Sequence, residues 1–237
     1  MVKMSNKVLI IIPAYNEAES IEDVISAVKK ELPDAGIVVI NDGSRDATSS
    51  LSKRLGATVA DLPYNMGIGA AMQTGYKYAV LNDYDIAVQV DGDGQHPPDQ
   101  INYLIGPISK GKADMVIGSR FLEMGEYHPS LARNIGIKIF STVISLITGR
   151  KITDTTSGFR AVNKGPIRFF AQNYPDDYPE VEAIVLLCKA GFNIMETAVR
   201  MKERTGGKSS ITALQGVYYM VKVLLSIFID MLKRVKR

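Results

Sequence analysis

The sequence has very few of the residues that build disulfides and zinc sites. It contains one cysteine, Cys188, and two histidines among 237 residues, which excludes an internal disulfide and a cysteine-based zinc site. Cys188 lies in the apolar run 184–188, so we expect a buried thiol and a reducing compartment. The N-terminus also lacks the long apolar segment and cleavage site of a signal peptide, and we therefore expect a protein of the cytoplasm or of its membrane surface.

A strong charge bias is also missing. The net charge is only +3, with 46% hydrophobic and 22% charged residues. This composition excludes a disordered or fibrous chain and suits one globular domain with a substantial core. We expect no nucleic-acid partner.

Apolar runs typical of buried strands alternate with segments of helical periodicity. The expected strands cover 8–12, 37–40, 57–60, 86–90, 113–118 and 193–201. The expected helices cover 18–30, 46–55, about 65–79, 98–109, 131–147 and 182–190. The alternation predicts an α/β fold with a mostly parallel, doubly wound sheet flanked by helices, whose ligands bind at the carboxyl ends of the strands. Three polar loops meet there, at 13–17, 41–44 and 91–95.

The run 86–90 ends in Asp91-Gly92-Asp93. Two carboxylates one residue apart offer hard oxygen ligands for Mg²⁺ or Mn²⁺, with a substrate's phosphates completing the shell. Aspartate and glycine are also the residues that a tight turn selects, so the motif by itself leaves both interpretations open.

A basic, glycine-containing loop covers residues 202–210. It places Lys202, Arg204 and Lys208 around Gly206 and Gly207. Backbone N–H groups together with Arg and Lys can hold a phosphate, and a solvated basic loop explains the composition equally well.

The segment from 211 to the end has the periodicity of a helix with one narrow polar stripe, and its last five residues include four cations. Its apolar run is shorter than the roughly 20 residues that cross a bilayer, so we expect no transmembrane span. Two interpretations remain, namely a helix packed on the core or on a second subunit of a homo-oligomer, and a helix in the membrane interface. The basic end favours the membrane surface.

Six short motifs occur in a fixed order along the chain. They are Pro13-Ala14-Tyr15-Asn16-Glu17, Asn41-Asp42-Gly43-Ser44, Asp91-Gly92-Asp93-Gly94-Gln95-His96-Pro97, Gly118-Ser119-Arg120, Asp154-Thr155-Thr156-Ser157-Gly158-Phe159-Arg160 and the loop 204–209. In this order they resemble the family 2 glycosyltransferases of GT-A fold, above all the dolichol-phosphate mannose synthase branch, which includes bacterial polyprenyl-phosphate glycosyltransferases. The resemblance predicts a glycosyltransferase domain over 1–210, followed by an amphipathic, basic-ended helix over 211–237.

The resemblance implies a nucleotide-diphosphate-sugar donor and Mg²⁺ or Mn²⁺ as cofactor. Asp42 would contact the base, and Arg120 matches a position used around the donor phosphates. The residues implied to line the nucleoside are Pro13, Ala14, Tyr15 and Glu17, and those implied to hold the metal on the diphosphate are Asp91, Asp93 and Gln95. A divalent cation stabilises the negative charge that develops on a leaving diphosphate, which agrees with these residue types.

The resemblance also implies a polyprenyl phosphate acceptor. Such a phosphate is largely ionised at neutral pH, because its second pKa is about 6, whereas a sugar hydroxyl needs a general base. The matching phosphate ligands are Arg133, Arg204, Lys208 and Ser209, and the residues expected to be catalytic are Asp93, Arg133 and Arg204. Arg133 has a second interpretation, because a long cationic side chain can extend from an apolar helix into solvent.

Five further positions have weaker signals. His96 precedes two prolines, and we expect it to shape the loop rather than bind a metal. Glu180 and Glu182 fall near the place where other family 2 enzymes carry a catalytic carboxylate, and they are equally explained as residues of a helix start. Gly67 and Gly69 can approach a phosphate or permit a close packing contact.

Three functions follow from these features. The first is an inverting, metal-dependent transfer of a sugar to a polyprenyl phosphate at the cytoplasmic face of the membrane. The second uses the same donor and a glycan or other hydroxyl acceptor, with Glu180 or Glu182 as base. The third is a catalytically silent nucleotide-sugar-binding scaffold. The intact Asp91 and Asp93 pair and the basic loop favour the first.

Overall fold

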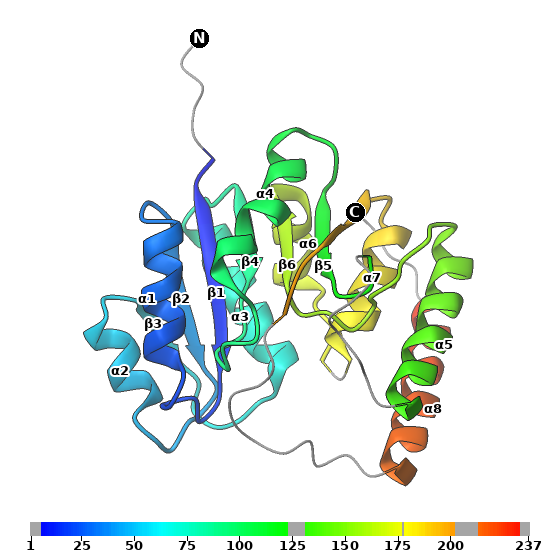
Figure 1. Ribbon diagram of the computed structural model, residues 1–237, viewed down its shortest axis with the longest axis horizontal. Helices are drawn as coiled ribbons and strands as arrows, with labels where there is room; N and C mark the ends of the chain where they lie inside the picture. Colours follow the sequence, from blue (N-terminus) through cyan, green and yellow to red (C-terminus); the bar gives the residue numbers. More distant parts are fainter. Residues whose placement is uncertain (1–5, 123–130, 177, 202–212, 233–237) are drawn as a thin grey trace.

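The computed structural model describes residues 6–122, 131–176, 178–201 and 213–232, with the side chains of 131–135, 213–219 and 230 left undescribed. These residues form a seven-stranded sheet covered by helices (Figure 1). The strands are β1 (Val8–Ala14), β2 (Gly36–Asn41), β3 (Thr58–Asp61), β4 (Ile86–Gln89), β5 (Met115–Ser119), β6 (Arg160–Asn163) and β7 (Ile194–Ala198). The helices are α1 (Ile21–Glu31), α2 (Thr48–Arg54), α3 (Ile68–Leu81), the 3-10 turn η1 (Pro98–Gln100), α4 (Ile101–Ser109), α5 (Leu131–Thr148), α6 (Lys164–Gln172), α7 (Pro179–Lys189) and α8 (Ala213–Leu232).

The sheet confirms the predicted mostly parallel α/β architecture. Its strand order is β3-β2-β1-β4-β6-β5-β7. β6 pairs antiparallel with both β4 and β5, and the other pairings are parallel. The carboxyl ends of β1, β2 and β4 therefore lie at one edge of the sheet, which brings the three polar loops together.

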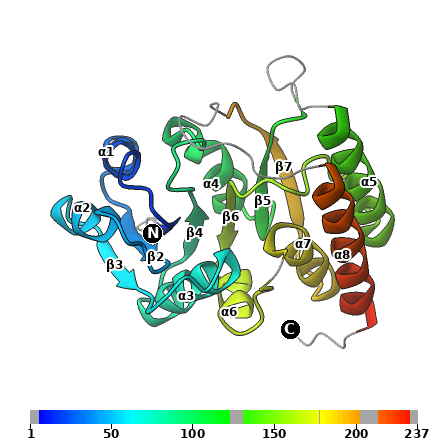
Figure 2. The same ribbon diagram turned by 90° about the horizontal axis from the view of Figure 1, so that it is seen from below.

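Alternating side chains of the strands supply two separate cores. On β1, Leu9 and Ile11 belong to one buried cluster, and Ile10 and Ile12 belong to the other. A strand buried on both faces needs apolar residues at successive positions, which explains the unbroken run in β1. Helices α1 and α4 cover one face of the sheet, and α3, α6 and α7 cover the other (Figure 2).

Four elements differ from the sequence prediction. β6 and α6 were not predicted, because β6 is only four residues long and begins with the buried Arg160. The predicted helix at 182–190 begins earlier, at Pro179, which puts Glu180 in its first turn. The last predicted strand ends at Ala198 and not at 201.

Helix α8 packs on the body of the molecule through one of its faces. Val223 and Ile227 are buried in the same core as α7, while other apolar side chains of α8 are exposed. None of the described helices has both the length and the hydropathy that crossing a bilayer requires. The predicted boundary between 1–210 and 211–237 falls outside the described residues and stays a prediction.

Candidate functional site

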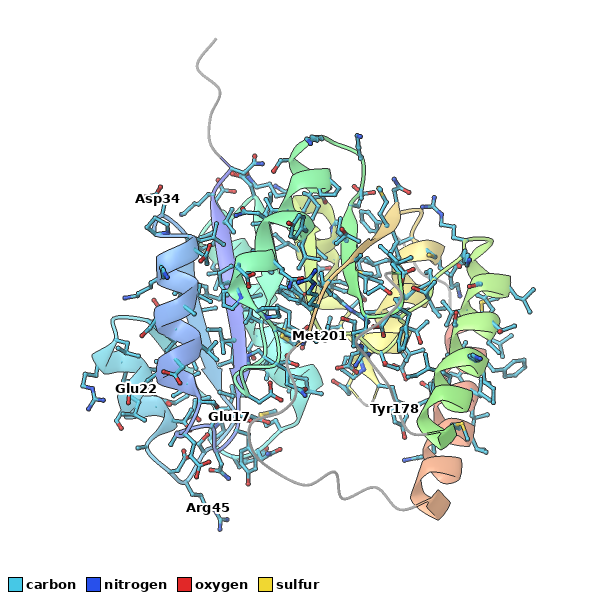
Figure 3. The ribbon with its side chains drawn as sticks, viewed as in Figure 1. Glu17, Glu22, Asp34, Arg45, Tyr178 and Met201 are labelled. Carbon is cyan, nitrogen blue, oxygen red and sulfur yellow. The ribbon has the colours of Figure 1, made fainter. Side chains whose placement is uncertain are left out.

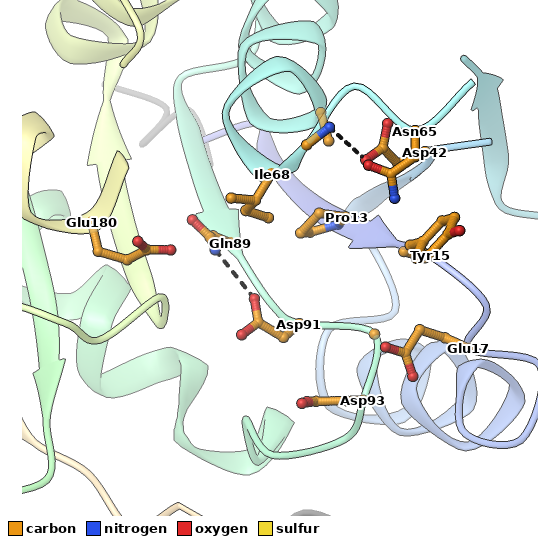
Figure 4. Close-up of a pocket in the computed structure, with 14 residues that line it drawn as sticks. Pro13, Tyr15, Glu17, Asp42, Asn65, Ile68, Gln89, Asp91, Asp93 and Glu180 are labelled. Atoms are coloured by element: carbon orange, nitrogen blue, oxygen red, sulfur yellow. Dashed lines mark hydrogen bonds between the residues drawn. The ribbon is translucent and has the colours of Figure 1, made fainter. Parts of the chain in front are cut away.

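A cavity of about 320 Å³ opens at the carboxyl edge of the sheet (Figure 4). The ends of β1, β2 and β4 and the starts of α3 and α7 form its walls. The lining residues are Pro13, Ala14, Tyr15, Glu17, Asp42, Asn65, Gly67, Ile68, Ala71, Gln89, Asp91, Gly92, Asp93 and Glu180. Every residue predicted to contact the nucleoside, and both predicted metal carboxylates, are among them.

The loop after β1 is fixed by the loop after β2. Asn16 adopts a left-handed conformation with φ of 55°. Its backbone N–H donates to Ser44 Oγ at 2.9 Å, and its side-chain oxygen accepts from the N–H of Arg45 at 2.9 Å. The Glu17 N–H donates to Thr48 Oγ1 at 2.9 Å. These hydrogen bonds between the two loops fix the backbone next to Tyr15. The wall of the cavity that Tyr15 lines therefore forms as part of the fold.

Asp42 binds the backbone of the chain itself. Its two carboxylate oxygens accept hydrogen bonds from the N–H groups of Met66 at 2.7 Å and Gly67 at 2.9 Å. Gly43 lets the two loops approach, since a Cβ there would lie 2.5 Å from the Tyr64 carbonyl carbon and its φ is 69°. The predicted contact of Asp42 with a base stays a prediction, and its carboxylate already holds the loop that precedes α3.

Asp91 and Asp93 follow β4 on a loop that His96 shapes. The N–H of Asp91 donates to His96 Nδ1 at 3.0 Å, and the buried His96 ring stacks on Phe159 with centroids 4.9 Å apart. Gln89 Nε2 donates to Asp91 Oδ1 at 3.2 Å. The structure thus agrees with a loop-shaping role for His96, which was the prediction from sequence.

The two aspartates fit a divalent cation that also binds phosphate oxygens. Both side chains are half-buried and face the cavity (Figure 4). The described part of the chain holds no cluster of three His, Cys, Asp or Glu side chains placed to bind a metal. A site with two carboxylates leaves coordination positions for a diphosphate, as Mg²⁺ sites in nucleotide enzymes do. Gln95 is outside the cavity lining, and its role as a ligand stays a prediction.

Glu180 is the lining residue that comes from the second half of the chain. It is half-buried in the first turn of α7, and Figure 4 shows its carboxyl group directed toward Gln89 and Asp91. Burial raises the pKa of Glu180; the nearby Arg160 guanidinium opposes this shift, and the Asp91 carboxylate adds to it. A proton therefore stays on this carboxyl group at higher pH than on an ordinary glutamate.

Glu182 points away from the cavity, which makes it unsuitable as the base suggested by the sequence. Its buried carboxylate accepts a hydrogen bond from Ser226 on α8 and does not line the cavity. Residues two apart on a helix lie on different faces, so Glu180 and Glu182 cannot both face the site.

Arg120 forms a buried ion pair within the fold. Its Nε donates to Asp154 at 2.7 Å, and its terminal nitrogen donates to the other Asp154 oxygen at 2.7 Å and to Thr156 Oγ1 at 2.9 Å. Glu196 in turn accepts from the N–H groups of Thr153 and Asp154, each at 2.8 Å. Arg120 is not a lining residue, and its predicted contact with donor phosphates stays a prediction.

The predicted acceptor-phosphate residues are not placed by the structure. Arg133 belongs to the first turn of α5, where only the backbone is described. Arg204, Lys208 and Ser209 lie outside the described residues. Their roles therefore rest on the sequence motifs alone.

Sequence reasoning missed the cavity roles of Asn65 and Gln89. Gln89 precedes Asp91 by two positions, and the alternation of side chains along a strand puts both on one face. Asn65 lines the cavity because Asp42 binds the backbone of the next residue, Met66, and so holds this loop against the site. No local feature of the sequence indicated that contact.

The family model described as "Glycosyl transferase family 2" matches residues 9–169. The polyprenol monophosphomannose synthase of Mycolicibacterium smegmatis is 29% identical, over 89% of this chain and 83% of the relative. The UDP-N-acetylglucosamine–dolichyl-phosphate N-acetylglucosaminyltransferase of Methanococcus voltae is 31% identical, over 83% of this chain and 86% of the relative.

Among solved structures, the chain is similar to glucosyl-3-phosphoglycerate synthase from Mycobacterium tuberculosis in complex with Mn²⁺, UDP and glucosyl-3-phosphoglycerate. The TM-score is 0.71 at 17% identity, and the match covers 95% of this chain and 80% of the other. At this identity the likeness concerns the fold.

Proposed function

Because the chain belongs to glycosyl transferase family 2 and has its GT-A fold, we propose that this glycosyltransferase moves a sugar from a nucleotide-diphosphate-sugar to a polyprenyl phosphate. The observation that carries the donor half is the cavity that joins the three motif loops around Asp91 and Asp93. The acceptor half is supported by relatives named for transfer to polyprenol or dolichyl phosphate, and by the basic motif at 204–209.

In this proposal the nucleoside lies between Tyr15 and Asp42, and the diphosphate lies beside Asp91 and Asp93. Mg²⁺ or Mn²⁺ bound by these carboxylates would stabilise the negative charge on the departing diphosphate. An oxygen of the acceptor phosphate attacks the anomeric carbon of the sugar, and the bond from that carbon to the diphosphate oxygen breaks. The nucleoside diphosphate leaves, and the configuration at the anomeric carbon inverts.

The proposed reaction needs no general base. The phosphate nucleophile already carries negative charge near neutral pH, since its second pKa is about 6. Cationic side chains suit its recognition, and Arg133, Arg204 and Lys208 are the proposed ligands together with Ser209.

One observation favours the second candidate, a hydroxyl acceptor. Glu180 lines the cavity with a pKa raised by burial, which is a property of many general bases. Under that alternative, Glu180→Gln would keep donor binding and lose turnover by about a hundredfold or more.

We also propose that α8 contacts the membrane surface. Val221, Leu225, Phe228 and Leu232 recur at helical spacing, and each is between 57% and 72% exposed. An exposed apolar face of this kind marks an interaction surface, and the four cations among the last five residues favour anionic lipid as its partner. Replacing Leu225 and Phe228 with Ser should reduce flotation with anionic vesicles. A second subunit as partner would instead appear as a dimer that these substitutions dissociate.

The proposed function is tested by a donor screen that measures nucleotide release. Purified protein with Mn²⁺ is given GDP- and UDP-sugars, with and without polyprenyl phosphate. We expect release from one class of donor that increases strongly when the lipid phosphate is present. Release that depends on a glycan acceptor and ignores the lipid would favour the second candidate, and no release with any donor would favour a silent scaffold.

A further inference from the structure

Glu180 lines the cavity from the first turn of α7. Figure 4 places its carboxyl group across the cavity from Asp42, with Gln89 and Asp91 in between. A nucleotide sugar has a fixed covalent order of base, ribose, diphosphate and sugar. If the diphosphate lies at Asp91 and Asp93, as in the proposed function on which this inference rests, a base near Asp42 directs the sugar toward Glu180.

The backbone around Glu180 is firmly held. Pro179 occupies the first helical position of α7, and two N–H groups of the first turn donate to the Tyr178 carbonyl at 3.1 and 3.2 Å. The preceding segment packs directly on α3, because a Cβ on Gly69 would lie 2.4 Å from the Pro175 carbonyl oxygen. The Glu180 side chain is therefore presented to the cavity from a rigid support, as a residue that positions a substrate requires.

The Glu180 carboxyl group accepts a hydrogen bond from its own backbone N–H. Arg160 is the cation whose charge acts on it, but Arg160 Nε donates to the Ser157 carbonyl at 2.6 Å, and its terminal nitrogen donates to the Thr155 carbonyl at 3.2 Å. In the described part of the chain, no other residue donates a hydrogen bond to the Glu180 side chain. One backbone N–H leaves most acceptor positions of this half-buried carboxylate unpaired, and the hydroxyl groups of a ligand would fill them.

We propose that Glu180 is a specificity-determining residue that accepts hydrogen bonds from hydroxyl groups of the donor's sugar. A carboxylate has two oxygens, which suit two hydroxyls on neighbouring carbons. A sugar that lacks one of them leaves a buried acceptor unpaired, so the site discriminates against it. The role concerns binding and placement of the sugar, and it is distinct from proton removal from an acceptor.

The test compares the wild type with Glu180→Gln and with Asp176→Asn, an exposed control that loses the same charge close to α7. Calorimetry with Mn²⁺ and without acceptor measures the Kd of the nucleoside diphosphate and of the nucleotide sugar. For Glu180→Gln we expect about tenfold or greater weakening for the nucleotide sugar and less than about twofold for the nucleoside diphosphate. Asp176→Asn should change neither value.

Donors that lack single hydroxyl groups identify the contact. The wild type should bind one or two of these analogues about tenfold more weakly than the parent donor, and Glu180→Gln should no longer distinguish them. Unchanged discrimination, or equal weakening of both ligands, overturns the inference. Normal donor binding with a turnover loss of about a hundredfold or more also overturns it, because that result assigns Glu180 as the base.

These measurements separate this inference from the acceptor assignment. If the wild type binds nucleotide sugars through Glu180 but transfers no sugar to polyprenyl phosphate, only the proposed acceptor is wrong. A wild type that binds nucleoside diphosphate and sugar nucleotide equally well contradicts the role of Glu180 and leaves the acceptor assignment intact.

Discussion

Two carboxylates stand on opposite sides of the cavity, Asp42 after β2 and Glu180 at the start of α7 (Figure 4). Both Asp42 oxygens accept backbone N–H groups, from Met66 and Gly67. Glu180 accepts a hydrogen bond from its own backbone N–H and none from any other residue that the structure describes. The two groups have similar chemistry and line one cavity, but the protein gives both oxygens of Asp42 a partner from another loop and gives Glu180 only its own backbone N–H.

The difference separates a part of the site that the fold completes from a part that a ligand completes. Around Asp42, the loops after β1, β2 and β3 bind one another, and Figure 3 shows Glu17 and Arg45 near the same end of the sheet. Around Glu180, the neighbouring Arg160 is bound to backbone carbonyls. Substitutions at the Asp42 end should therefore affect stability, and substitutions at the Glu180 end should affect specificity.

The largest effect on activity is expected at Asp93, which lies between the Asp42 and Glu180 ends of the cavity. Replacement by Ala removes one of the two carboxylates proposed to hold the metal, so transfer should fall by about a thousandfold or more. Nucleotide release measures the loss, and Asp99→Asn, an exposed residue of η1, is the matched control. Activity within tenfold of the wild type would contradict the proposed metal site between Asp42 and Glu180.

Asp42→Ala should give the next largest effect, on the free energy of unfolding. The substitution leaves the N–H groups of Met66 and Gly67 without their charged acceptor, at a cost of about 2–3 kcal/mol. Asp42→Asn should lose less, because its amide oxygen can still accept one of the two bonds. Urea unfolding of both variants measures this order, and equal stability of the three proteins would show that Asp42 does not hold the loop.

Glu180→Gln should show the smallest effect on stability. It should stabilise the protein, whereas the Asp42 substitutions should destabilise it. Burial raises the pKa of Glu180, so its stabilising contribution is complete below the pKa of an unfolded glutamate and is lost as pH rises through the folded value. The variant should therefore melt higher than the wild type at pH 7.5, by about 2 °C, with the difference shrinking toward pH 4.5. Thermal melts across this range measure it. A lower Tm for the variant at pH 7.5 would mean that the protein itself satisfies Glu180.

Much of the fold followed from the sequence, because strands buried on both faces give continuous apolar runs. β1, β2 and β4 were placed in this way, together with the loops that follow them. β6 was missed because its four residues include the buried Arg160, whose charge is satisfied by carbonyl groups of a loop that only the folded chain brings near. Its antiparallel pairing depends on the same tertiary contacts.

The candidate site was predictable where its residues follow strands, as Asp42, Asp91 and Asp93 do. Glu180 remained open because its direction depends on whether α7 begins at 179 or at 182. For the neighbouring Glu182, the deciding contact is with Ser226, which is 44 residues away in the sequence. Such long-range contacts have no local signal, so helix periodicity alone could not separate the two glutamates.

The central claim, transfer of a sugar to a polyprenyl phosphate, is tested most directly by the mass of the product. The wild type and Asp93→Ala are incubated with Mn²⁺, the nucleotide sugar that binds best, and polyprenyl phosphate. The lipid phosphate should gain the mass of one sugar residue with the wild type and remain unchanged with Asp93→Ala. Free sugar from donor hydrolysis as the only product, with the lipid unmodified, would contradict the proposed acceptor.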